Sequence, residues 1–376
     1  MLFHLHQNYK MSPRLSLKLK NISFLLMIFV AFIHGYNLNV RMGGSDYNAP
    51  PYWLRFIETF ISDGVCRMAV PMFFAISGYL ACIKIKEDFT WIWYANLLKK
   101  KFFSLLLPYL LVSGLGICLV ILLQLIPFSK PFFNNFAVGE TTVSQWVHIW
   151  LLSPVPFQLW FVRFLMFYFI LLPIFYYMIK YFKILFLFVL LAFWLYIPWQ
   201  ELTGFVKLQF ESAFFFCTGL FFSIFDLNPE YKIKPVFFGI LFLAWIAWIF
   251  YRTGSFLKID FNPYYVHYHI VGITLSGLFI FWWIYDLFQE LIENNKWIMA
   301  NSIYSFGIFL FHEPFLTILK KIMIRLLGSN EFGLLFIYIS TPLLALLFGL
   351  YFSKFLEKYF VSAYLVFTGS RTDKTI

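Results

Sequence analysis

The chain has 376 residues, of which 61% are hydrophobic and only 12% are charged, and its mean hydropathy is +0.77. A soluble globular domain carries roughly 25% charged residues, so water could not solvate the surface of a fold built from this sequence. The composition therefore excludes the soluble classes and places much of the surface against lipid. The length is typical of one helical bundle.

The net charge of +11 does not indicate a nucleic-acid partner. The lysines and arginines are scattered through the short connections between apolar runs and do not gather in one basic patch. This placement is typical of residues that fix topology at a cytoplasmic membrane surface. The cysteines show no CxxC spacing and no Cys/His cluster, so we expect neither a metal site nor a disulfide framework.

A polar, basic tail opens the chain at residues 1–21, and an apolar run follows at 22–38. A cleaved signal peptide is the alternative interpretation of this run, but no small-residue cleavage site follows it. We therefore expect residues 22–38 to form an uncleaved first transmembrane helix.

Nine further apolar runs follow, most of them close to the roughly 20 residues that a spanning helix needs. They lie near Arg67–Ile83, Phe102–Ile126, Leu159–Ile179, Ile184–Trp199, Phe210–Phe225, Val236–Tyr251, Val266–Phe288, Trp297–Ile318 and Phe332–Phe352. Because lipid offers no partner for unpaired backbone groups, each run is predicted to be a helix. The predicted fold is all-α: a polytopic transmembrane bundle of about ten spans over residues 22–360, with a tail at 361–376.

The distribution of basic residues predicts the orientation of this bundle. If the N-terminus is cytoplasmic and the sides alternate, most lysines and arginines fall in the cytoplasm, and both termini lie there. The cluster Lys320–Arg325 falls on the opposite side and counts against this orientation. The long connections near 39–66 and 127–158 are predicted to lie on the membrane or to dip into it.

Ionisable residues inside predicted spans are the candidate functional residues, since each costs at least roughly 2.5–3.5 kcal/mol to insert. His34 lies deep in the first run, and its imidazole is suited to act as general base on a hydroxyl. A structural histidine bonded to a neighbouring backbone group or tyrosine is the alternative. Arg163 opens the fourth run and requires an anion such as phosphate, a carbonyl cage or a water-filled path, unless it reaches the interface.

The run that Arg67 precedes brings Ser77, Gly78 and Tyr79 to mid-span. Close helix packing by small residues is the simpler explanation of Ser77 and Gly78.

His312 and Glu313 are adjacent ionisable residues deep in the ninth run, and packing alone explains them poorly. They are candidates for a proton relay or for binding a substrate hydroxyl. Neighbours in sequence point about 100° apart on a helix, so the two need not share a partner. No Gly-rich phosphate loop, nucleophile elbow or metal motif occurs in the sequence, so a soluble-enzyme mechanism is not expected.

Several sequence motifs occur in a fixed order along nearly the whole chain. They are the histidine at 34, RMAVPMFFAISGYL at 67–80, KKKFFSLLLPYLL at 99–111, LWFVRFL at 159–165, FFFCTGLFFS at 214–223, SFGIFLFHEPFL at 305–316 and FTGSR at 367–371. Together they resemble the acyltransferase 3 family of multi-span membrane proteins, which O-acylate sugars and related acceptors. Two positions depart from the common family pattern: Ser23 stands where many members have an arginine, and Phe164 where many have an acid.

The resemblance implies an acyl-CoA donor in the cytoplasm, most simply acetyl-CoA, and an acceptor hydroxyl reached from the other side. The acceptor class would be a surface or envelope polysaccharide or a lipid-linked sugar, in the inner membrane of a bacterium. It implies that His34 acts as general base, that His312 and Glu313 complete the proton path, and that Arg67 or Arg163 binds the donor.

Ser77 and Tyr79 are further candidates for substrate or donor binding, because they belong to one of the matching motifs. Apart from lipid, the expected partners are the acyl-CoA donor and the glycan acceptor, with no metal and no nucleic acid. A polysaccharide or lipid-linked glycan exporter is the main alternative, since the same bundle suits sugar passage. A sensor or assembly partner without catalysis is a third possibility.

Overall fold

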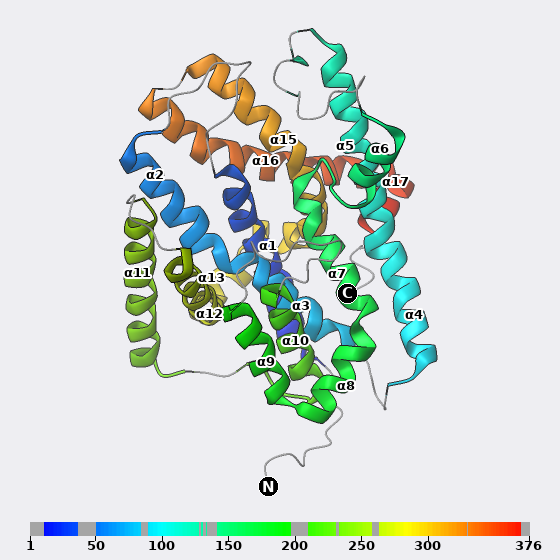
Figure 1. The fold of residues 1–376 in the computed structure, drawn as a ribbon, viewed down its shortest axis with the longest axis vertical. Coiled ribbons are helices and arrows are strands. Elements are labelled where there is room, and N and C mark those ends of the chain that lie inside the picture. Colours follow the sequence, from blue (N-terminus) through cyan, green and yellow to red (C-terminus); the bar gives the residue numbers. More distant parts are fainter. Residues whose placement is uncertain are drawn as a thin grey trace. The chain divides into compact units, whose positions relative to one another are not determined.

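The computed structural model of the protein describes residues 11–36, 50–83, 89–127, 129–130, 133, 141–196, 210–230, 233–257, 263–328 and 330–369. Throughout these residues the regular structure is helical, as the sequence predicts, and no strand occurs among them (Figure 1). The first ten α-helices are α1 Pro13–Gly35, α2 Tyr52–Glu58, α3 Ala69–Cys82, α4 Trp91–Lys101, α5 Leu107–Leu125, α6 Val143–Leu151, α7 Trp160–Ile170, α8 Leu172–Phe182, α9 Ile184–Tyr196 and α10 Phe210–Ile224. The remaining ones are α11 Pro235–Leu257, α12 Pro263–Leu287, α13 Gln289–Glu293, α14 Lys296–Asn301, α15 Ser305–Leu327, α16 Glu331–Tyr359 and α17 Val361–Thr368.

Within the described residues, each of the ten predicted apolar runs overlaps at least one helix, but the helices differ in length. Among the described residues, seven helical stretches are long and apolar enough to cross a membrane, or eight if the bent pair α7 and α8 is one span. The seven are Pro13–Gly35, Tyr52–Cys82, Trp91–Leu125, Pro235–Ser255, Tyr268–Leu287, Lys296–Leu327 and Glu331–Tyr359. Helices α9 and α10 are apolar but shorter. The helical membrane class is thus confirmed, whereas the count of ten and the orientation remain predictions.

Several helices begin earlier or end later than hydropathy alone predicts. Helix α1 starts at Pro13, inside the predicted tail, and α17 lies in the predicted C-terminal tail. Residues 52–66, expected in a connection, form α2 and a π-helical turn that lead into α3. Helix α15 continues to Leu327, so the basic cluster expected in a loop is helical.

The chain forms two compact units whose segments alternate along the sequence. Unit 1 comprises residues 1–23, 67–98 and 167–298, and unit 2 comprises residues 24–66, 99–166 and 299–376.

In unit 1, helices α3 and α10 pack with their backbones in contact, as their neighbouring positions in Figure 1 illustrate. A Cβ on Gly78 would lie 1.9 Å from the carbonyl oxygen of Phe216, and a Cβ on Gly219 would lie 1.9 Å from that of Ala75. Only glycine permits this approach at either position. Small-residue packing, the simpler reading of the motif around Gly78, is therefore correct for this glycine.

The start of α1 is held in unit 1 by a buried ion pair. Lys18 is only 1% exposed; its Nζ lies 2.7 Å from the Asp286 carboxylate and 3.9 Å from the centroid of the Trp282 ring. The lysine expected in a cytoplasmic tail is thus a packed residue of the first helix.

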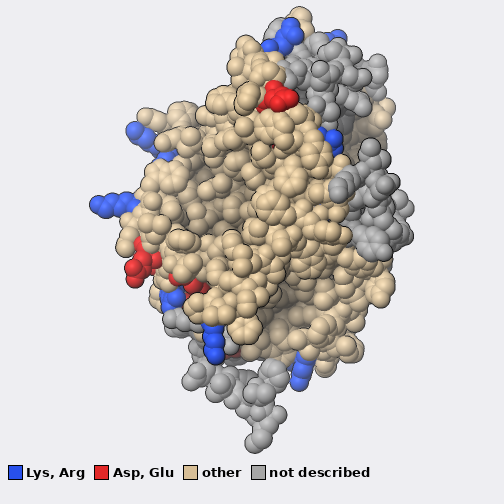
Figure 2. All heavy atoms as spheres, turned by 90° about the vertical axis from the view of Figure 1, so that its left-hand side faces the viewer, with Lys and Arg blue, Asp and Glu red and all other residues tan. Residues whose placement is uncertain are grey.

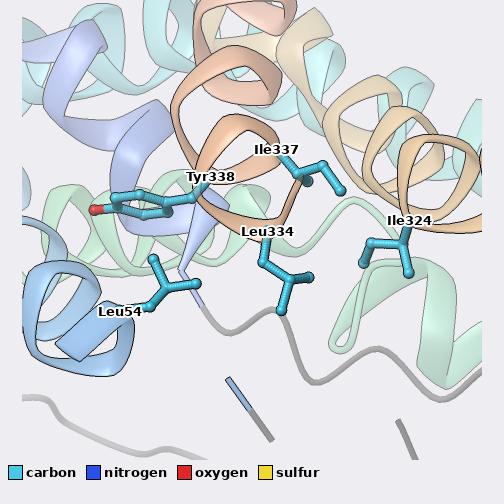
Figure 3. Packing of buried hydrophobic residues seen from close by; sticks show 5 residues of the cluster. All are labelled: Leu54, Ile324, Leu334, Ile337 and Tyr338. Carbon is cyan, nitrogen blue, oxygen red and sulfur yellow. The ribbon is translucent and has the colours of Figure 1, made fainter. Parts of the chain in front are cut away.

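In unit 2, helices α15 and α16 pack through small residues and stacked rings. A Cβ on Gly307 would lie 2.2 Å from the Ser353 hydroxyl, and Phe315 stacks on Phe348 with ring centroids 4.0 Å apart. An apolar cluster at the far end of the pair joins α2 to both helices (Figure 3). Its buried members are Leu54, Ile324, Leu334, Ile337 and Tyr338.

Helices α5 and α6, also in unit 2, fix the turn that precedes α7. Tyr109 and Ser113 donate hydrogen bonds to the carbonyls of Leu151 and Trp150, each at 2.7 Å. A Cβ on Gly116 would lie 2.4 Å from Pro156 Cδ, so this glycine lets the chain pass close to α5.

The C-terminal motif also has a structural explanation in unit 2. Gly369 ends α17 with φ +65°, and a Cβ there would lie 2.4 Å from Ser104 Cα. Glycine is required on both counts. Arg371 of the same motif lies outside the described residues.

The exposed residues fit a lipid environment. Large apolar side chains are widely exposed, among them Ile92, Val143 and Phe332 at 78%, 79% and 79%. On the face in Figure 2, lysine, arginine and acidic residues are few among the uncharged atoms. Water could not solvate such a surface, whereas lipid tails can.

Candidate active site

The site begins with a break in helix α15. Glu313 adopts an extended backbone conformation, φ −108° and ψ 142°, inside the helix, and Pro314 follows it. Proline has no N–H, so the carbonyl of Leu310, one turn earlier, has no donor within the helix. The Glu313 carboxylate accepts hydrogen bonds from the backbone N–H and the hydroxyl of Thr317, at 3.3 and 3.1 Å. It thereby caps the second half of α15.

Gln158 supplies the donor that the break requires. Its Nε2 donates to the carbonyls of Leu310 and Glu313, both at 3.2 Å. The side chain lies in the 3-10 turn Phe157–Leu159 and is 1% exposed. The turn held by α5 and α6 is thus joined to the broken segment of α15.

His312 sits on the last turn before the break and is fully buried. Its Nδ1 lies 3.0 Å from the Ile308 carbonyl and 2.9 Å from the Phe309 carbonyl. Carbonyls only accept, so Nδ1 carries the proton, and Nε2 of the neutral ring holds a lone pair. Nε2 is buried and has no hydrogen-bond partner among the described residues. An imidazole with one nitrogen anchored and the other open has the arrangement of a general base.

His34 approaches this imidazole from the last turn of α1. The two ring centroids are 5.4 Å apart, and the Phe157 ring lies 6.1 Å from that of His34. His34 is half-buried, and its ring forms no hydrogen bond within the described part of the chain. The two histidines that the sequence places on one proton path thus lie in ring contact, and their catalytic roles stay predictions.

The end of α1 is held in place by Lys320 and by Gly35. Lys320, 7% exposed, donates from Nζ to the carbonyls of His34, Gly35 and Tyr36 at 3.4, 3.3 and 3.3 Å. A cation at a helix C-terminus satisfies carbonyls that lack a helical donor and opposes the helix dipole. A Cβ on Gly35 would lie 2.6 Å from Pro342 Cγ, so only glycine lets α1 end against α16.

Two acidic residues of unit 2 interact with the same lysine. Glu58 and Glu313, 3% and 6% exposed, both interact electrostatically with Lys320. Oε1 of Glu58 has no hydrogen-bond partner among the described residues. The charge of this buried lysine is therefore compensated by carboxylates as well as by the helix end.

Arg163, on the first turn of α7, differs from the other cations of the site. It is half-buried, and within the described residues no carboxylate forms an ion pair with it. Its guanidinium lies 5.2 Å from the ring centroid of Phe164, at the position where the resemblance of the motif leads us to expect an acid. With no acidic partner among the described residues, the guanidinium can bind an anionic ligand.

The other predicted residues belong to unit 1. Arg67 pairs with Glu211, with Nη2 to Oε2 at 3.1 Å, Ser77 is half-buried, and Tyr79 is 6% exposed. Of the predicted residues, the structure brings His34 and His312 into ring contact and places Glu313 and Arg163 in the same unit.

Sequence reasoning missed Gln158 and Lys320. Pro314 in an apolar run signals that a carbonyl freed inside a membrane requires a donor, but it does not identify Gln158 as that donor. Lys320 was read as a loop residue that opposes the predicted orientation. It lies inside α15 with its charge satisfied in the protein, so it does not count against that orientation.

A helical membrane bundle with a paired-imidazole site is consistent with the acyl-transfer chemistry that the motifs imply. The chain belongs to the family described as "Acyltransferase domain", which its sequence matches over residues 19–358. It is therefore an integral membrane acyltransferase, and the resemblance seen in the sequence is confirmed. Among curated proteins it is similar to the succinoglycan biosynthesis protein ExoH of Rhizobium meliloti (strain 1021). The two are 26% identical over 370 residues, which cover 96% of this chain and 94% of the relative. No solved structure matches the chain.

Proposed function

We propose that this protein transfers an acyl group, most simply acetyl, from a cytoplasmic acyl-CoA to a sugar hydroxyl. The acceptor is a surface or envelope polysaccharide or a lipid-linked sugar, and the membrane is the inner membrane of a bacterium. The name of the similar protein ExoH, which refers to succinoglycan biosynthesis, supports a polysaccharide acceptor.

The contact between the rings of His34 and His312 is the observation that carries this proposal. In the proposed reaction, His34 removes the proton from the acceptor hydroxyl, and the oxygen attacks the thioester carbonyl. The carbon–sulfur bond breaks, CoA leaves as a thiolate, and the imidazolium returns the proton to its sulfur. His312, with Nδ1 anchored on the backbone, offers Nε2 as the neighbouring proton acceptor.

Arg163 is the residue that we assign to the donor, as a partner for its phosphate or thioester oxygen. No acidic partner of Arg163 occurs in the described part of the chain, which favours it over Arg67, whose guanidinium is already paired with Glu211. The lysines at 99–101 would attract the anionic donor at the cytoplasmic face. Ser77, Tyr79 and Glu313 remain candidates for substrate contact or for the proton path.

The test is acyl transfer by the purified full-length protein in lipid nanodiscs. Radiolabelled acetyl-CoA is supplied with a bacterial envelope glycan fraction, and label in the glycan is measured. The His34→Ala variant should lose roughly 10²–10⁴-fold in rate, the usual contribution of a positioned base. The His148→Ala variant removes an exposed histidine on α6 and should keep the wild-type rate.

Transfer by His34→Ala at the wild-type rate would contradict this mechanism. Movement of glycan across vesicle membranes by the wild type, without incorporation of label, would instead support the exporter alternative. Ser23 keeps this alternative open. Its hydroxyl donates a hydrogen bond to the Leu19 carbonyl within α1, and it supplies no positive charge that could bind an acyl-CoA donor.

A further inference from the structure

Gln158 has a fixed orientation, and this orientation leaves one of its polar atoms unused. Both hydrogen bonds of Nε2 go to carbonyl oxygens, those of Leu310 and Glu313. If the amide were turned over, Oε1 would face two acceptors and no donor, so the hydrogen-bond network settles which atom is which. Oε1 is buried and has no partner among the described residues.

A second open acceptor belongs to the segment of α15 that Gln158 contacts. Nε2 of His312 is also buried and without a partner, and His312 is flanked in sequence by residues whose carbonyls hold Gln158. The segment 310–313 thus carries one open acceptor, the His312 imidazole nitrogen, and holds the amide that carries the other, the Gln158 carbonyl oxygen. Buried acceptors without donors cost free energy, so a ligand that brings donors to both is favoured.

The two substrates differ in whether they can donate hydrogen bonds to these open acceptors. Phosphate and thioester oxygens of the donor only accept hydrogen bonds, so they cannot satisfy these atoms. Hydroxyl groups donate, and a sugar carries several of them on neighbouring carbons. The open atoms thus favour the hydroxyls of the acceptor substrate over the phosphate and thioester groups of the donor.

The turn that carries Gln158 combines an exposed residue with the buried amide. Phe157, the preceding residue, is 65% exposed, and its ring lies 6.1 Å from that of His34. A ligand that contacts Phe157 and His34 therefore touches the residue that directly precedes Gln158 in the chain.

We propose that Gln158 is a specificity-determining residue that binds the acyl acceptor. Its Oε1 accepts a hydrogen bond from a hydroxyl adjacent to the one that is acylated. The acceptor is thus a sugar with neighbouring hydroxyls, one activated at the imidazole pair and the other held by the amide. This assignment rests on the proposed O-acyl transfer and specifies how the acceptor is recognised.

The experiment combines a substrate change with a protein change. Acetyl transfer from labelled acetyl-CoA is measured with methyl β-D-glucopyranoside, methyl β-D-galactopyranoside and their monodeoxy derivatives as probes. The wild type should lose about 10- to 100-fold in kcat/KM with one deoxy derivative that still carries the acylated hydroxyl, because Oε1 then stays unpaired. Gln158→Met should reduce kcat/KM for the parent sugar by a similar factor. For that deoxy derivative, the variant should have nearly the same kcat/KM as the wild type.

The outcomes separate this assignment from its alternatives. If Gln158 only supports the break in α15, Gln158→Met lowers transfer to the parent sugar and to every deoxy derivative by the same factor. This result overturns the assignment. A rise in KM for acetyl-CoA without a change in acceptor preference also overturns it. The wild-type measurement alone overturns it if every derivative that keeps the acylated hydroxyl reacts like the parent, so the test survives a variant that fails to fold. No transfer from the wild type to any of these sugars, with label still appearing in the envelope glycan fraction, overturns this assignment and leaves the proposed function standing. No transfer to the glycan fraction either contradicts the proposed function itself.

Gln145→Met is the matched control. Gln145 lies exposed on α6, where its side chain caps the start of the helix, and it has no part in the proposed site. Its variant should keep the wild-type preference among all the probes.

Discussion

Two consecutive residues of α15 have different roles because the helix breaks between them. His312 belongs to the first half and bonds to that half's carbonyls through Nδ1. Glu313 is extended, and its carboxylate caps the second half at Thr317. The sequence predicted both as parts of a proton path. The geometry favours His312 for proton transfer and gives Glu313 a capping role.

The His312→Asn variant should separate the anchoring role of Nδ1 from the proton-accepting role of Nε2. In His312→Asn the side-chain amide reproduces the Nδ1 donor, whereas the open Nε2 is lost. We expect near-normal thermal stability and a loss of roughly 10²–10⁴-fold in acyl transfer. In His312→Leu the donor is lost as well, and the unpaired carbonyls should cost about 1–3 kcal/mol of stability. Thermal melts by size-exclusion chromatography and transfer rates measure the two effects. Equal stability of the two variants would contradict the anchoring role of Nδ1.

The histidines could be predicted from sequence, because an ionisable residue in an apolar run is costly and conspicuous. Gln158 could not, since a neutral amide next to a predicted span attracts no attention until the carbonyls at the α15 break are known. Lys320 was seen but misread, because hydropathy places the end of the run before it. The identity of a side chain can be read from sequence, but its hydrogen-bond partner depends on an element far away in the chain.

At the scale of elements, the site depends on how the end of α1 meets α15. Lys320 satisfies three carbonyls there and interacts with the carboxylates of Glu58 and Glu313. Lys320→Met should therefore leave a helix end and two buried acids without their cation, and His34 should lose its fixed position. We expect kcat to fall at least about tenfold and the melting temperature to drop.

Lys321→Met is the neighbouring control, since Lys321 lies over the Phe133 ring, 4.2 Å from its centroid, whereas Lys320 donates to the carbonyls at the end of α1. A Lys320→Met variant with unchanged kcat would show that the position of His34 does not depend on this lysine. Steady-state rates at saturating acyl-CoA and acceptor decide the question.

The contact between α3 and α10 makes a second prediction at this scale. In Gly219→Ala the new methyl group would lie 1.9 Å from the Ala75 carbonyl oxygen, so the helices must separate. Overpacking of this kind typically costs about 1–3 kcal/mol. Gly239→Ala, on α11, has nothing within 4 Å of the new methyl and should be neutral, or stabilising by up to about 1 kcal/mol. Thermal melts of both variants test the contrast, which fails if the two behave alike.

Helices were predicted well where apolar runs are long and poorly at their ends. Hydropathy marks residues that face lipid, but α2 and the second half of α15 also contain buried polar residues such as Glu58 and Lys320. Because these residues lower the local hydropathy, the predicted apolar run ends before the helix does. The small residues at 78 and 219 appeared in the motifs, but only the structure shows that they meet each other.

For the whole molecule, composition predicts a lipid-facing helical bundle, and the structure confirms this class. The number of crossings is a separate question, because α9 and α10 have 13 and 15 residues and are about 20 Å long. The hydrocarbon core is about 30 Å thick. We propose that both helices nevertheless cross, which gives ten spans with both termini in the cytoplasm. If instead they enter and leave on the cytoplasmic side, eight spans result, and both termini are again cytoplasmic.

Reporters at the termini therefore cannot distinguish these topologies, but the connection between α9 and α10 can. With ten spans, residue 207 faces the side opposite the cytoplasm; with eight, it does not reach that side. Lys207→Cys in a background without the four native cysteines should react with a membrane-impermeant maleimide added to intact spheroplasts. A cysteine in place of Lys183, between α8 and α9, should react only after lysis, because that connection is cytoplasmic in both topologies. Labelling at 207 only after lysis would contradict ten crossings, and labelling at 183 before lysis would contradict the orientation itself.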